Sequence, residues 1–349
     1  MMLADHGAEV IRIERPSGGL NVTDPARDPL LRSRRNVTLD LKHPLAIGAV
    51  RRLAENCDGL IEGFRPGVME RLGLGPNVLL AANPRLVYGR MTGYGQDGPL
   101  AQEPGHDIDY IAISGALHAF GEAGGKPVPP INMVGDFGGG GMMLAVGMLA
   151  AILQAQATGM GQVVDCAMAE GSAVLMSMIW GFRGMGRWSE ARGTNLIDGG
   201  APFYGTYETA DGKWVAIGAL EPQFYAAMRT AMALDGPEWD TQFAPAIWPR
   251  LKQDLAYRFK QRTRDEWVEA FAGHDACFQP VLGFDEAAAH PHNVARGAFV
   301  QAGGVVQPAP APRYSASRTV EPRMAGETQG RAILEEAGFE EHEITALLG

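Results

Sequence analysis

The sequence contains little cysteine, few aromatic residues and no excess of basic charge. Its three cysteines, Cys57, Cys166 and Cys277, are too few and too scattered for a disulfide framework or a cysteine metal cluster. We interpret them as reduced buried thiols, which favours a cytoplasmic protein. The 30 Lys and Arg against 40 Asp and Glu give a formal net charge of −10. That balance argues against a nucleic-acid partner, because such proteins bind phosphates with an excess of Lys and Arg.

Long apolar runs are also absent. The longest, Met142–Leu153, falls short of the roughly 20 residues that cross a bilayer, so we interpret it as a buried core helix and expect no membrane contact. The segment Met1–Pro16 carries acidic residues and has no apolar core of the kind that marks a targeting signal. It begins as a helix that leads directly into a strand, and we expect the first strand of the fold and its turn to be absent.

The 349 residues, 46% of them hydrophobic, are enough for a sizeable core, and at about 150 residues per domain they suggest two domains. In the N-terminal part, short strand patterns alternate with helical spacing, which predicts an α/β layer with a mainly parallel sheet. A second unit begins near Tyr204, where two strand patterns flank a turn at Asp211–Gly212. A Pro-rich link, Gln307–Pro312, precedes the last helix and a short acidic tail. Strands are expected at Glu9–Glu14, Val37–Leu41, Gly59–Glu62, Leu86–Tyr88 and Gln162–Asp165, and helices at Pro44–Asn56, Val78–Asn83, Met142–Ala157, Ala169–Trp180, Glu221–Leu234, Trp248–Phe259, Arg264–Phe271, Asp285–His290 and Arg331–Glu336.

Two titratable groups lie in glycine-containing segments. His106 follows Gly105, and Asp136 lies between Gly135 and the run Gly138–Gly141. A lone histidine is more often a surface or core residue than a catalytic one. Asp136 is equally well interpreted as the N-cap of the helix after it. The glycines follow no P-loop or dinucleotide-binding pattern, so phosphate cradling is unsupported. They do allow a ligand to approach the backbone closely before a helix.

Basic residues gather in the first 90 positions although the chain is acidic overall. The planar guanidinium of Arg suits a phosphorylated cofactor tail, while for any single residue surface solvation is an equal alternative. The set is Arg15, Arg32, Arg34, Arg35, Lys42, Arg65, Arg71 and Arg90. The methionines Met142, Met143, Met148, Met176 and Met178 are typical of a core, and they also suit an adaptable apolar pocket.

Several long segments, in order along nearly the whole chain, resemble the α-methylacyl-CoA racemase branch of the family III CoA-transferases. The segments are ERPSGG, RSRRNVTLDLK, LIEGFRPGVMERLGLGP, YGRMTGYGQDGP, GHDIDYIAISGALHAFG, PVPPINMVGDFGGGGM, GQVVDCAM, RGTNLIDGGAPFYGTYETADGKWVAIGALEPQFY and PAPRYS. The resemblance implies an α/β fold in which a Rossmann-like large domain with a parallel sheet carries a smaller inserted α+β domain, and two chains form an interlocked homodimer. It places the N-terminal part of the large CoA-binding domain at 1–185, the small domain at 200–292 and the C-terminal return at 300–349.

The same resemblance implies interconversion of (2R)- and (2S)-2-methylacyl-CoA, a step in lipid and fatty acid metabolism, by two bases on opposite faces of the α-carbon. His106 and Asp136 match those bases. Glu221, supplied by the partner chain, matches the carboxylate that orients the histidine. The backbone N–H of Asp107 matches the donor to the thioester oxygen, and Asn132 matches a residue beside the acid. Neither a metal nor a redox cofactor is implied, since CoA belongs to the acyl-CoA substrate.

For the CoA moiety, the resemblance assigns residues around the N-terminal strands. Arg15, Arg65 and Arg71 are expected to bind the phosphates. The backbone of Leu39, Asp40, Leu41 and Lys42 is expected to lie near the adenine, and the segment from Gly105 to Tyr110 is expected to line the pantetheine. Arg32, Gly63 and Phe64 are expected to lie close to the pocket. Two alternatives stay open. One is a CoA transferase in which Asp136 attacks as nucleophile, and the other is a CoA-binding protein without catalysis. His106 together with Glu221 favours racemisation, because a transferase needs no second base.

Overall fold

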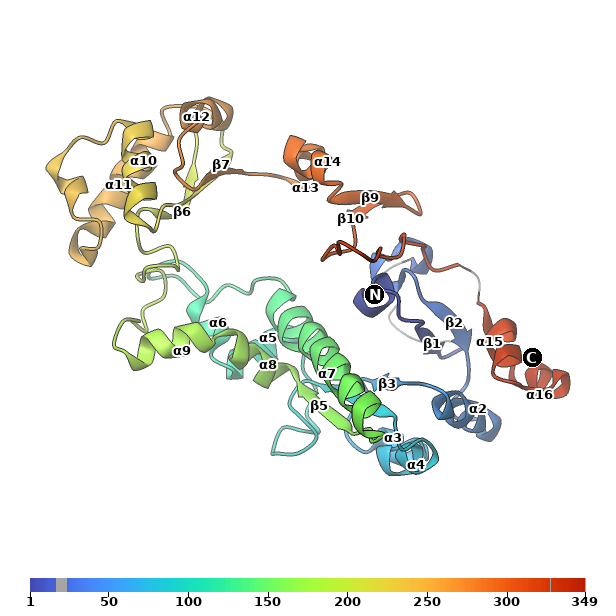
Figure 1. The fold of residues 1–349 in the computed structure, drawn as a ribbon. Coiled ribbons are helices and arrows are strands. Elements are labelled where there is room, and N and C mark those ends of the chain that lie inside the picture. The colour runs from blue at the N-terminus through green and yellow to red at the C-terminus, as the bar shows by residue number, and fades with distance from the viewer. Residues whose placement is uncertain (17–23, 327, 349) are drawn as a thin grey trace. The chain divides into compact units, whose positions relative to one another are not determined.

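The computed structural model describes residues 1–16, 24–326 and 328–348, and the chain divides into two compact units (Figure 1). The last three residues of the ERPSGG segment, 17–19, lie outside the described residues. The first unit comprises Met1–Gly105, Asp136–Gly171 and Ala288–Gly349, and the second comprises His106–Gly135 and Ser172–Ala287. The chain therefore passes from one unit to the other directly before His106 and again directly before Asp136.

Parallel strand pairs form the centre of the first unit. Strand β1 (Ile11–Glu14) pairs in parallel with β2 (Arg35–Thr38), and β3 (Gly59–Glu62), β4 (Val87–Thr92) and β5 (Val163–Ala167) form a parallel sheet in that order. The predicted parallel arrangement is confirmed. The strand expected at Val37–Leu41 was placed too late, because Asp40 turns the chain: its side chain accepts the backbone N–H of Lys42 at 3.0 Å.

The two faces of β4 pack against different helices. On one face, a Cβ at Gly89 would lie 2.6 Å from the Sδ of Met148, so glycine lets helix α7 (Met143–Thr158) cross closely. On the other face, the buried hydroxyl of Tyr88 donates to the carbonyl of Leu74 at 3.0 Å. The remaining elements assigned wholly to this unit are α1 (Met2–Asp5), the 3-10 turns Pro25–Arg27 and Pro29–Leu31, α2 (Pro44–Glu55), α3 (Val68–Arg71), α4 (Pro76–Ala82), α14 (Pro291–Arg296), β9 (Phe299–Ala302), β10 (Val305–Pro308), α15 (Gly330–Glu336) and α16 (Glu341–Leu348).

The C-terminal residues return to the core that α2 and β2 form. Ile333 and Leu334 of α15 are buried in it, and so is Ile344. The expectation that the helix at Arg331–Glu336 is the last one was therefore wrong, since the acidic segment after it folds as helix α16 over residues 341–348. Its acidic residues stay outside while Ile344 provides the apolar contact.

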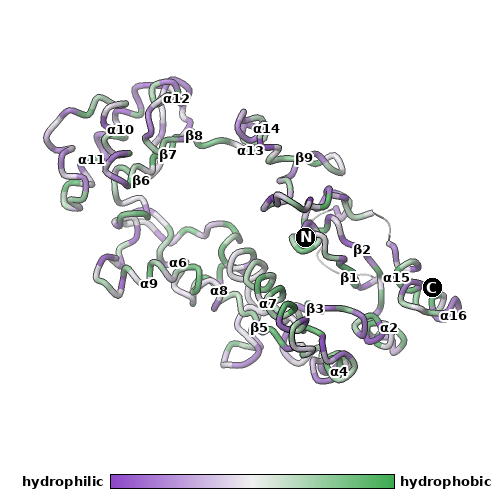
Figure 2. Tube along the Cα trace, viewed as in Figure 1, coloured by the Kyte–Doolittle hydropathy of each residue, from purple (hydrophilic) through white to green (hydrophobic). Residues whose placement is uncertain are grey.

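Helix α7 is buried on one face only. Leu144, Met148, Ala151 and Ala155 are buried against β4 and β5, whereas the opposite face is exposed and apolar, as the green colour of α7 in Figure 2 indicates. The prediction of a fully buried core helix was wrong in this respect. Together with the π-helix before it, the helix Met133–Thr158 is long and apolar enough to cross a membrane by length and composition, with a mean hydropathy of 1.6 over its best window.

The second unit holds an antiparallel sheet of β6 (Tyr204–Glu208), β7 (Trp214–Gly218) and β8 (Phe278–Val281), covered by α10 (Pro222–Met232), α11 (Trp248–Phe259) and α12 (Arg264–Phe271). Its core is aromatic: the rings of Phe271 and Phe278 stack with centroids 4.0 Å apart. The helix expected at Ala169–Trp180 is two helices that break at Met176. The other elements are α5 (Asp107–Ile113), α6 (Ala116–Ala119), α8 (Met168–Leu175), α9 (Ser177–Gly184), the 3-10 turns Pro237–Asp240 and Pro245–Ile247, and α13 (Phe284–Ala289).

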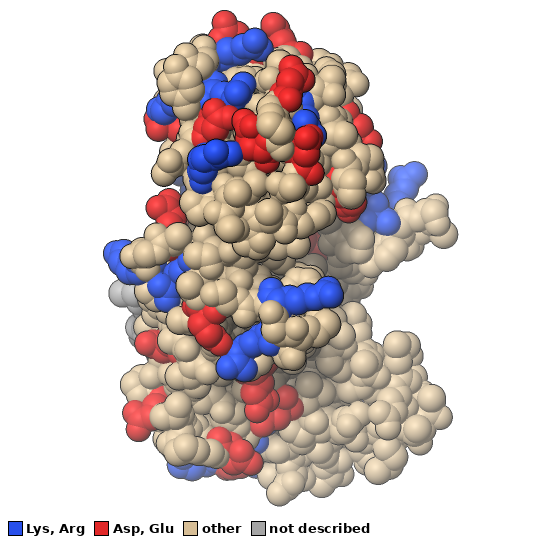
Figure 3. All heavy atoms as spheres, turned by 90° about the vertical axis from the view of Figure 1, so that its left-hand side faces the viewer, with Lys and Arg blue, Asp and Glu red and all other residues tan. Residues whose placement is uncertain are grey.

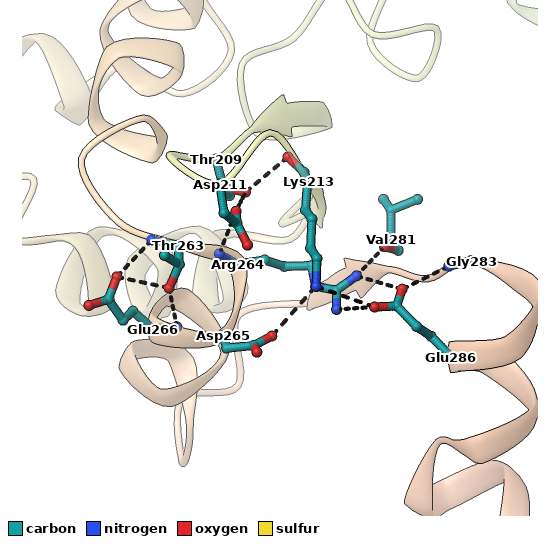
Figure 4. A network of polar contacts seen from close by, with 10 residues as sticks. All are labelled: Thr209, Asp211, Lys213, Thr263, Arg264, Asp265, Glu266, Val281, Gly283 and Glu286. Carbon is teal, nitrogen blue, oxygen red and sulfur yellow. Dashed lines mark hydrogen bonds and ion pairs between the residues drawn. The ribbon is translucent and has the colours of Figure 1, made fainter.

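One buried arginine ties three parts of the second unit together. The guanidinium of Arg264 donates two hydrogen bonds to the carboxylate of Glu286, at 2.7 and 2.8 Å, and one to the carbonyl of Val281 at 3.0 Å (Figure 4). Because α12, α13 and the end of β8 meet at this side chain, it fixes how they pack. On the face in Figure 3, basic and acidic side chains are interspersed, and broad areas carry neither.

Candidate active site

His106 lies at the start of helix α5. It is the N-cap, with extended backbone (φ −129°, ψ 175°), and its backbone N–H donates to the carboxylate of Asp109 at 2.9 Å. This hydrogen bond, from the N-cap N–H back to an acid in the first turn, fixes the direction in which the chain enters the helix. The His106 side chain is exposed while Asp107 directly after it is buried, so the imidazole stands at the surface of a rigidly held turn.

Asp136 lies inside a helix, in the π-helix Met133–Met142 that runs into α7. The alternative of Asp136 as N-cap is therefore wrong: that position belongs to Met142. The expectation that Gly138–Gly141 precede the helix was wrong as well, because these glycines are themselves helical. A Cβ on Gly171 would lie 2.9 Å from the Cα of Gly139, so these glycines let α8 cross the π-helix closely. Wide π-turns occur frequently at functional sites.

The chain neighbours of the two predicted bases touch. Gly135, directly before Asp136, packs on Asp107, directly after His106: a Cβ at Gly135 would lie 2.8 Å from the Cγ and 3.2 Å from the Cα of Asp107. Such distances leave no room for a side chain, so this position requires glycine. Asn132, four residues before Asp136, is half-buried on the same segment.

Glu221 is the N-cap of α10 and is exposed. The strand end before it is held by Gln242, a buried side chain whose amide donates to the carbonyls of Ala219 and Leu220 at 3.1 and 2.8 Å. Nearby, burial raises the pKa of the Cys277 thiol, and the negative charges of Asp275 and Glu221 add to that effect. Glu221 and His106 both belong to the second unit, and Asp136 belongs to the first.

The residues expected to bind CoA phosphates lie at the carboxyl ends of parallel strands, where open α/β sheets bind ligands. Gly63, Phe64 and Arg65 follow β3 and are exposed, and Arg71 ends helix α3. The N-cap of α3 is Gly67, whose φ of +83° favours glycine. Arg65 and Arg71 thus both present a guanidinium group to solvent, with the exposed carboxylate of Glu70 between them in the chain.

A second group lies at the corresponding ends of β1 and β2. Arg15 follows β1 and is exposed. Leu39 is buried, with its N–H donating to the carbonyl of Glu14 at 2.8 Å, while Asp40 and Lys42 are exposed and Leu41 is half-buried. Because β1 and β2 are parallel, Arg15 and the Leu39–Lys42 turn share one edge of the pair.

A family model described as CoA-transferase family III matches residues 1–327. The chain belongs to CoA-transferase family III. It is 44% identical over 352 residues to the α-methylacyl-CoA racemase of Mus musculus and 42% identical over 353 residues to that of Homo sapiens, covering 99% of this chain and 91% of each relative. Among solved structures, a CAIB/BAIF family protein from Brucella suis superposes with a TM-score of 0.81 at 25% identity, covering 96% of this chain and 93% of that one.

In this family III chain, every nitrogen of the Arg32 guanidinium donates a hydrogen bond to another group of the protein. Arg32 is 2% exposed, and its guanidinium donates to both carboxylate oxygens of Asp5 at 2.7 and 3.1 Å, to the side chain of Gln307 at 2.7 Å and to the carbonyl of Pro308 at 2.8 Å. These contacts give Arg32 a structural part, joining α1 to β10, and do not favour the predicted part in CoA binding.

Sequence reasoning missed the residues that hold the family III site residues in place. Asp109 and Gln242 act through backbone groups, and Gly135 acts by leaving room for Asp107. A pattern of residue types does not show which group a side chain meets. Of the three, only Asp109 had a local signal, since an acid three residues after an N-cap is typical of a capping box. Among the described residues, no three His, Cys, Asp or Glu side chains are placed to hold a metal.

Proposed function

We propose that this chain is an α-methylacyl-CoA racemase, an isomerase that interconverts (2R)- and (2S)-2-methylacyl-CoA. The observation that carries the proposal is its similarity, over 99% of its length, to two relatives of that name. The acyl-CoA substrate is consistent with the family III model that the chain matches. Within this proposal, a role in fatty acid and lipid metabolism follows from the substrate.

The proposed reaction moves one proton off C2 of the thioester and one proton back onto its other face. From one enantiomer, neutral His106 takes the C2 proton, the C–H electron pair moves into an enolate, and protonated Asp136 delivers a proton to the opposite face. From the other enantiomer, the Asp136 carboxylate takes the C2 proton and protonated His106 delivers one to the opposite face. Residues with pKa values near the working pH perform such transfers best. Gly135, directly before Asp136 in the chain, packs on Asp107, directly after His106, and this contact within the second unit supports the proposal.

The negative charge that develops on the thioester oxygen needs a donor held in place beforehand. We assign this part to the backbone N–H of Asp107, which the capping contact of Asp109 keeps at the first turn of α5. A preorganised donor of this kind lowers the barrier by about 3–4 kcal/mol. Glu221 would orient the imidazole and favour its charged form, and Asn132 would hydrogen-bond Asp136.

Binding of CoA falls in this proposal to the strand-end segments. Arg15, Arg65 and Arg71 would bind phosphates, the turn Leu39–Lys42 the adenine, and Gly105–Tyr110 the pantetheine. Exposed guanidinium groups beside a backbone turn support this assignment. The chemistry is proton transfer alone, so we propose that neither a metal nor a redox cofactor takes part. The three cysteines are free and support a cytoplasmic location, although only Cys166 is buried as expected, while Cys57 is half-buried and Cys277 is exposed.

We also propose that the active protein is a homodimer in which Glu221 comes from the partner chain. Support comes from the exposed face of α7. Met142, Val146, Leu149 and Leu153 recur at helical spacing, and their exposed fractions run from 41 to 67%. An apolar stripe of this kind on a helix marks a surface that another protein surface covers.

The test is α-proton exchange in heavy water with a panel of 2-methylacyl-CoA thioesters and no acceptor acid. A racemase incorporates deuterium at C2 and converts each pure enantiomer to a mixture. Strict dependence on an added carboxylic acid, with CoA moving to it, would make the chain a transferase with Asp136 as nucleophile. Binding of CoA without exchange or transfer would leave only a binding protein.

A further inference from the structure

A buried arginine of the first unit lies directly behind the segment proposed to bind CoA phosphates. Arg90, on β4, is 7% exposed, and in the parallel register it stands opposite Glu62 at the end of β3. Its Nε donates to Oε1 of Glu62 at 3.0 Å. Its two terminal nitrogens donate to the carboxylate oxygens of Glu70 on α3, at 2.9 and 3.2 Å. Each donor nitrogen of Arg90 is thus occupied by protein.

Both carboxylates hold backbone next to a predicted phosphate ligand. The second oxygen of Glu62 accepts the backbone N–H of Phe64 at 2.7 Å, one residue before Arg65. Glu70 directly precedes Arg71 in the chain. One guanidinium therefore links β4, the turn Gly63–Arg65 and helix α3 through charge-assisted hydrogen bonds, one pair of them bidentate, which is the strong and directional form.

The electrostatics of Arg90 indicates that its ion pairs with Glu62 and Glu70 persist. Burial alone would lower the pKa of Arg90, but hydrogen bonds and charge from Glu70 and Glu62 raise it, so the guanidinium stays charged. Burial raises the pKa of the Glu62 carboxyl, which is 5% exposed, while Arg90 lowers it, so removing Arg90 would take away the cation that favours the charged form. Lysine cannot replace it, because an ammonium lacks the planar fork that meets two carboxylates at once.

We propose that Arg90 is a positioning residue for CoA binding, which holds the turn Gly63–Arg65 and helix α3 in one arrangement through Glu62 and Glu70. The inference rests on the proposed function, because it takes Arg65 and Arg71 as phosphate ligands. Arg90 itself does not touch the substrate. Its effect is on the orientation of the two arginines, and therefore on the affinity for CoA rather than on the proton transfers at C2.

The second unit offers a matched control. Arg264 is equally buried, at 6% exposed, and is bidentate to Glu286, just as Arg90 is to Glu70 (Figure 4). The acidic partners also match, with 44% of the Glu70 side chain and 40% of the Glu286 side chain exposed. The variants Arg90→Lys and Arg264→Lys therefore make the same chemical change, as do Glu70→Gln and Glu286→Gln, whose half-exposed positions keep the fold intact.

The experiment measures the Kd of CoA by calorimetry, KM and kcat for α-proton exchange, and the melting temperature of the full chain. Arg90→Lys and Glu70→Gln are expected to raise Kd and KM by about tenfold while kcat changes by less than about threefold. Arg264→Lys and Glu286→Gln should lower the melting temperature by a similar amount and leave Kd within about twofold of wild type. In the double variant of Arg90 and Glu70, the two effects on Kd should be less than additive.

The experiment distinguishes failure of the Arg90 proposal from failure of the proposed racemase function. Equal Kd values in the two matched sets would overturn the positioning part of Arg90, whatever the catalysis. Absence of exchange in the wild-type protein, with CoA binding intact, would overturn the proposed racemase function alone, and the Kd comparison would still decide the part of Arg90. Absence of CoA binding in the wild-type protein would overturn both.

Discussion

At the scale of single residues, the site depends on contacts that fix the main chain next to the proposed catalytic residues. Asp109 holds the N–H of His106, Gln242 holds the strand end before Glu221, and Gly135 makes room for Asp107. None of these three is one of the proposed proton carriers. Their common effect is to fix where a catalytic side chain leaves the main chain, which matters because small displacements of reacting groups are costly to rate.

Substitution of either proposed base should stop exchange at C2. We expect His106→Gln and Asp136→Asn each to lower the rate of deuterium incorporation by about 10²–10⁴-fold, because each removes a group that carries a proton. The Kd of CoA should change little in Asp136→Asn, since Asp136 lies outside the segments assigned to CoA. Mass spectrometry of the product thioester gives the rate, and exchange at an unchanged rate in both variants would contradict the two-base proposal.

Gly135→Ala tests the close contact with Asp107. The added methyl group would lie 2.8 Å from the Asp107 Cγ, and overpacking of this kind costs about 1–3 kcal/mol. We expect a lower melting temperature and a lower kcat, because the methyl group would displace backbone directly next to His106 and Asp136 in the chain. Gly184→Ala in α9 is the control: nothing lies within 4 Å of its Cβ position, so it should be neutral or slightly stabilising. Similar behaviour of the two variants would contradict the packing.

At the scale of elements, strand ends and helix starts carry the proposed chemistry, and glycines decide how closely the elements cross. The sheet β3-β4-β5 sets Glu62 beside Arg90, and α7 crosses β4 at Gly89. Helical spacing predicted α11 and α12 at the observed residues, because the periodicity of apolar residues is local. The π-helix was not predicted, since its widened turn depends on the close crossing of α8 over Gly139.

The link between α12 and α13 predicts a pH dependence of stability. Hydrogen bonds from Arg264, and then from the N–H of Gly283, hold the pKa of the Glu286 carboxyl well below its usual range. A carboxyl with a lowered folded pKa stabilises the fold above the unfolded value, near 4.5, and loses that contribution as the pH falls further. Between pH 5 and 3, wild type should therefore lose stability more steeply than Glu286→Gln.

Tryptophan fluorescence during urea unfolding measures this effect in the right place. All six tryptophans lie in the second unit, as its residues 172–287 contain Trp180, Trp188, Trp214, Trp239, Trp248 and Trp267. Glu103→Gln, in an exposed turn of the first unit, serves as control. Equal slopes of unfolding free energy against pH in wild type and Glu286→Gln would show that the ion pair contributes nothing in acid.

At the scale of the whole molecule, the exposed stripe on α7 is the feature that a single chain leaves unexplained. Leu149→Glu places a charge in the middle of that stripe, and we expect it to convert a dimer to monomers and to abolish exchange, if Glu221 acts on the partner's site. Gln154→Glu adds the same charge to α7 outside the stripe and should leave the dimer intact. Sedimentation velocity reports the mass, and a Leu149→Glu dimer would contradict the proposed interface.

The sequence by itself determined the fold class, the parallel strands, most of the helices and the family, because periodicity, turns and ordered motifs are carried by neighbouring residues. It also indicated His106 and Asp136 as candidates. Only the tertiary structure decided that Asp136 lies within a π-helix, that Arg32 is enclosed by Asp5 and Gln307, and that Arg90 joins Glu62 to Glu70. Those outcomes depend on which side chains, from residues far apart in the chain, compete for the same few donors and the same space, and no local pattern records that competition.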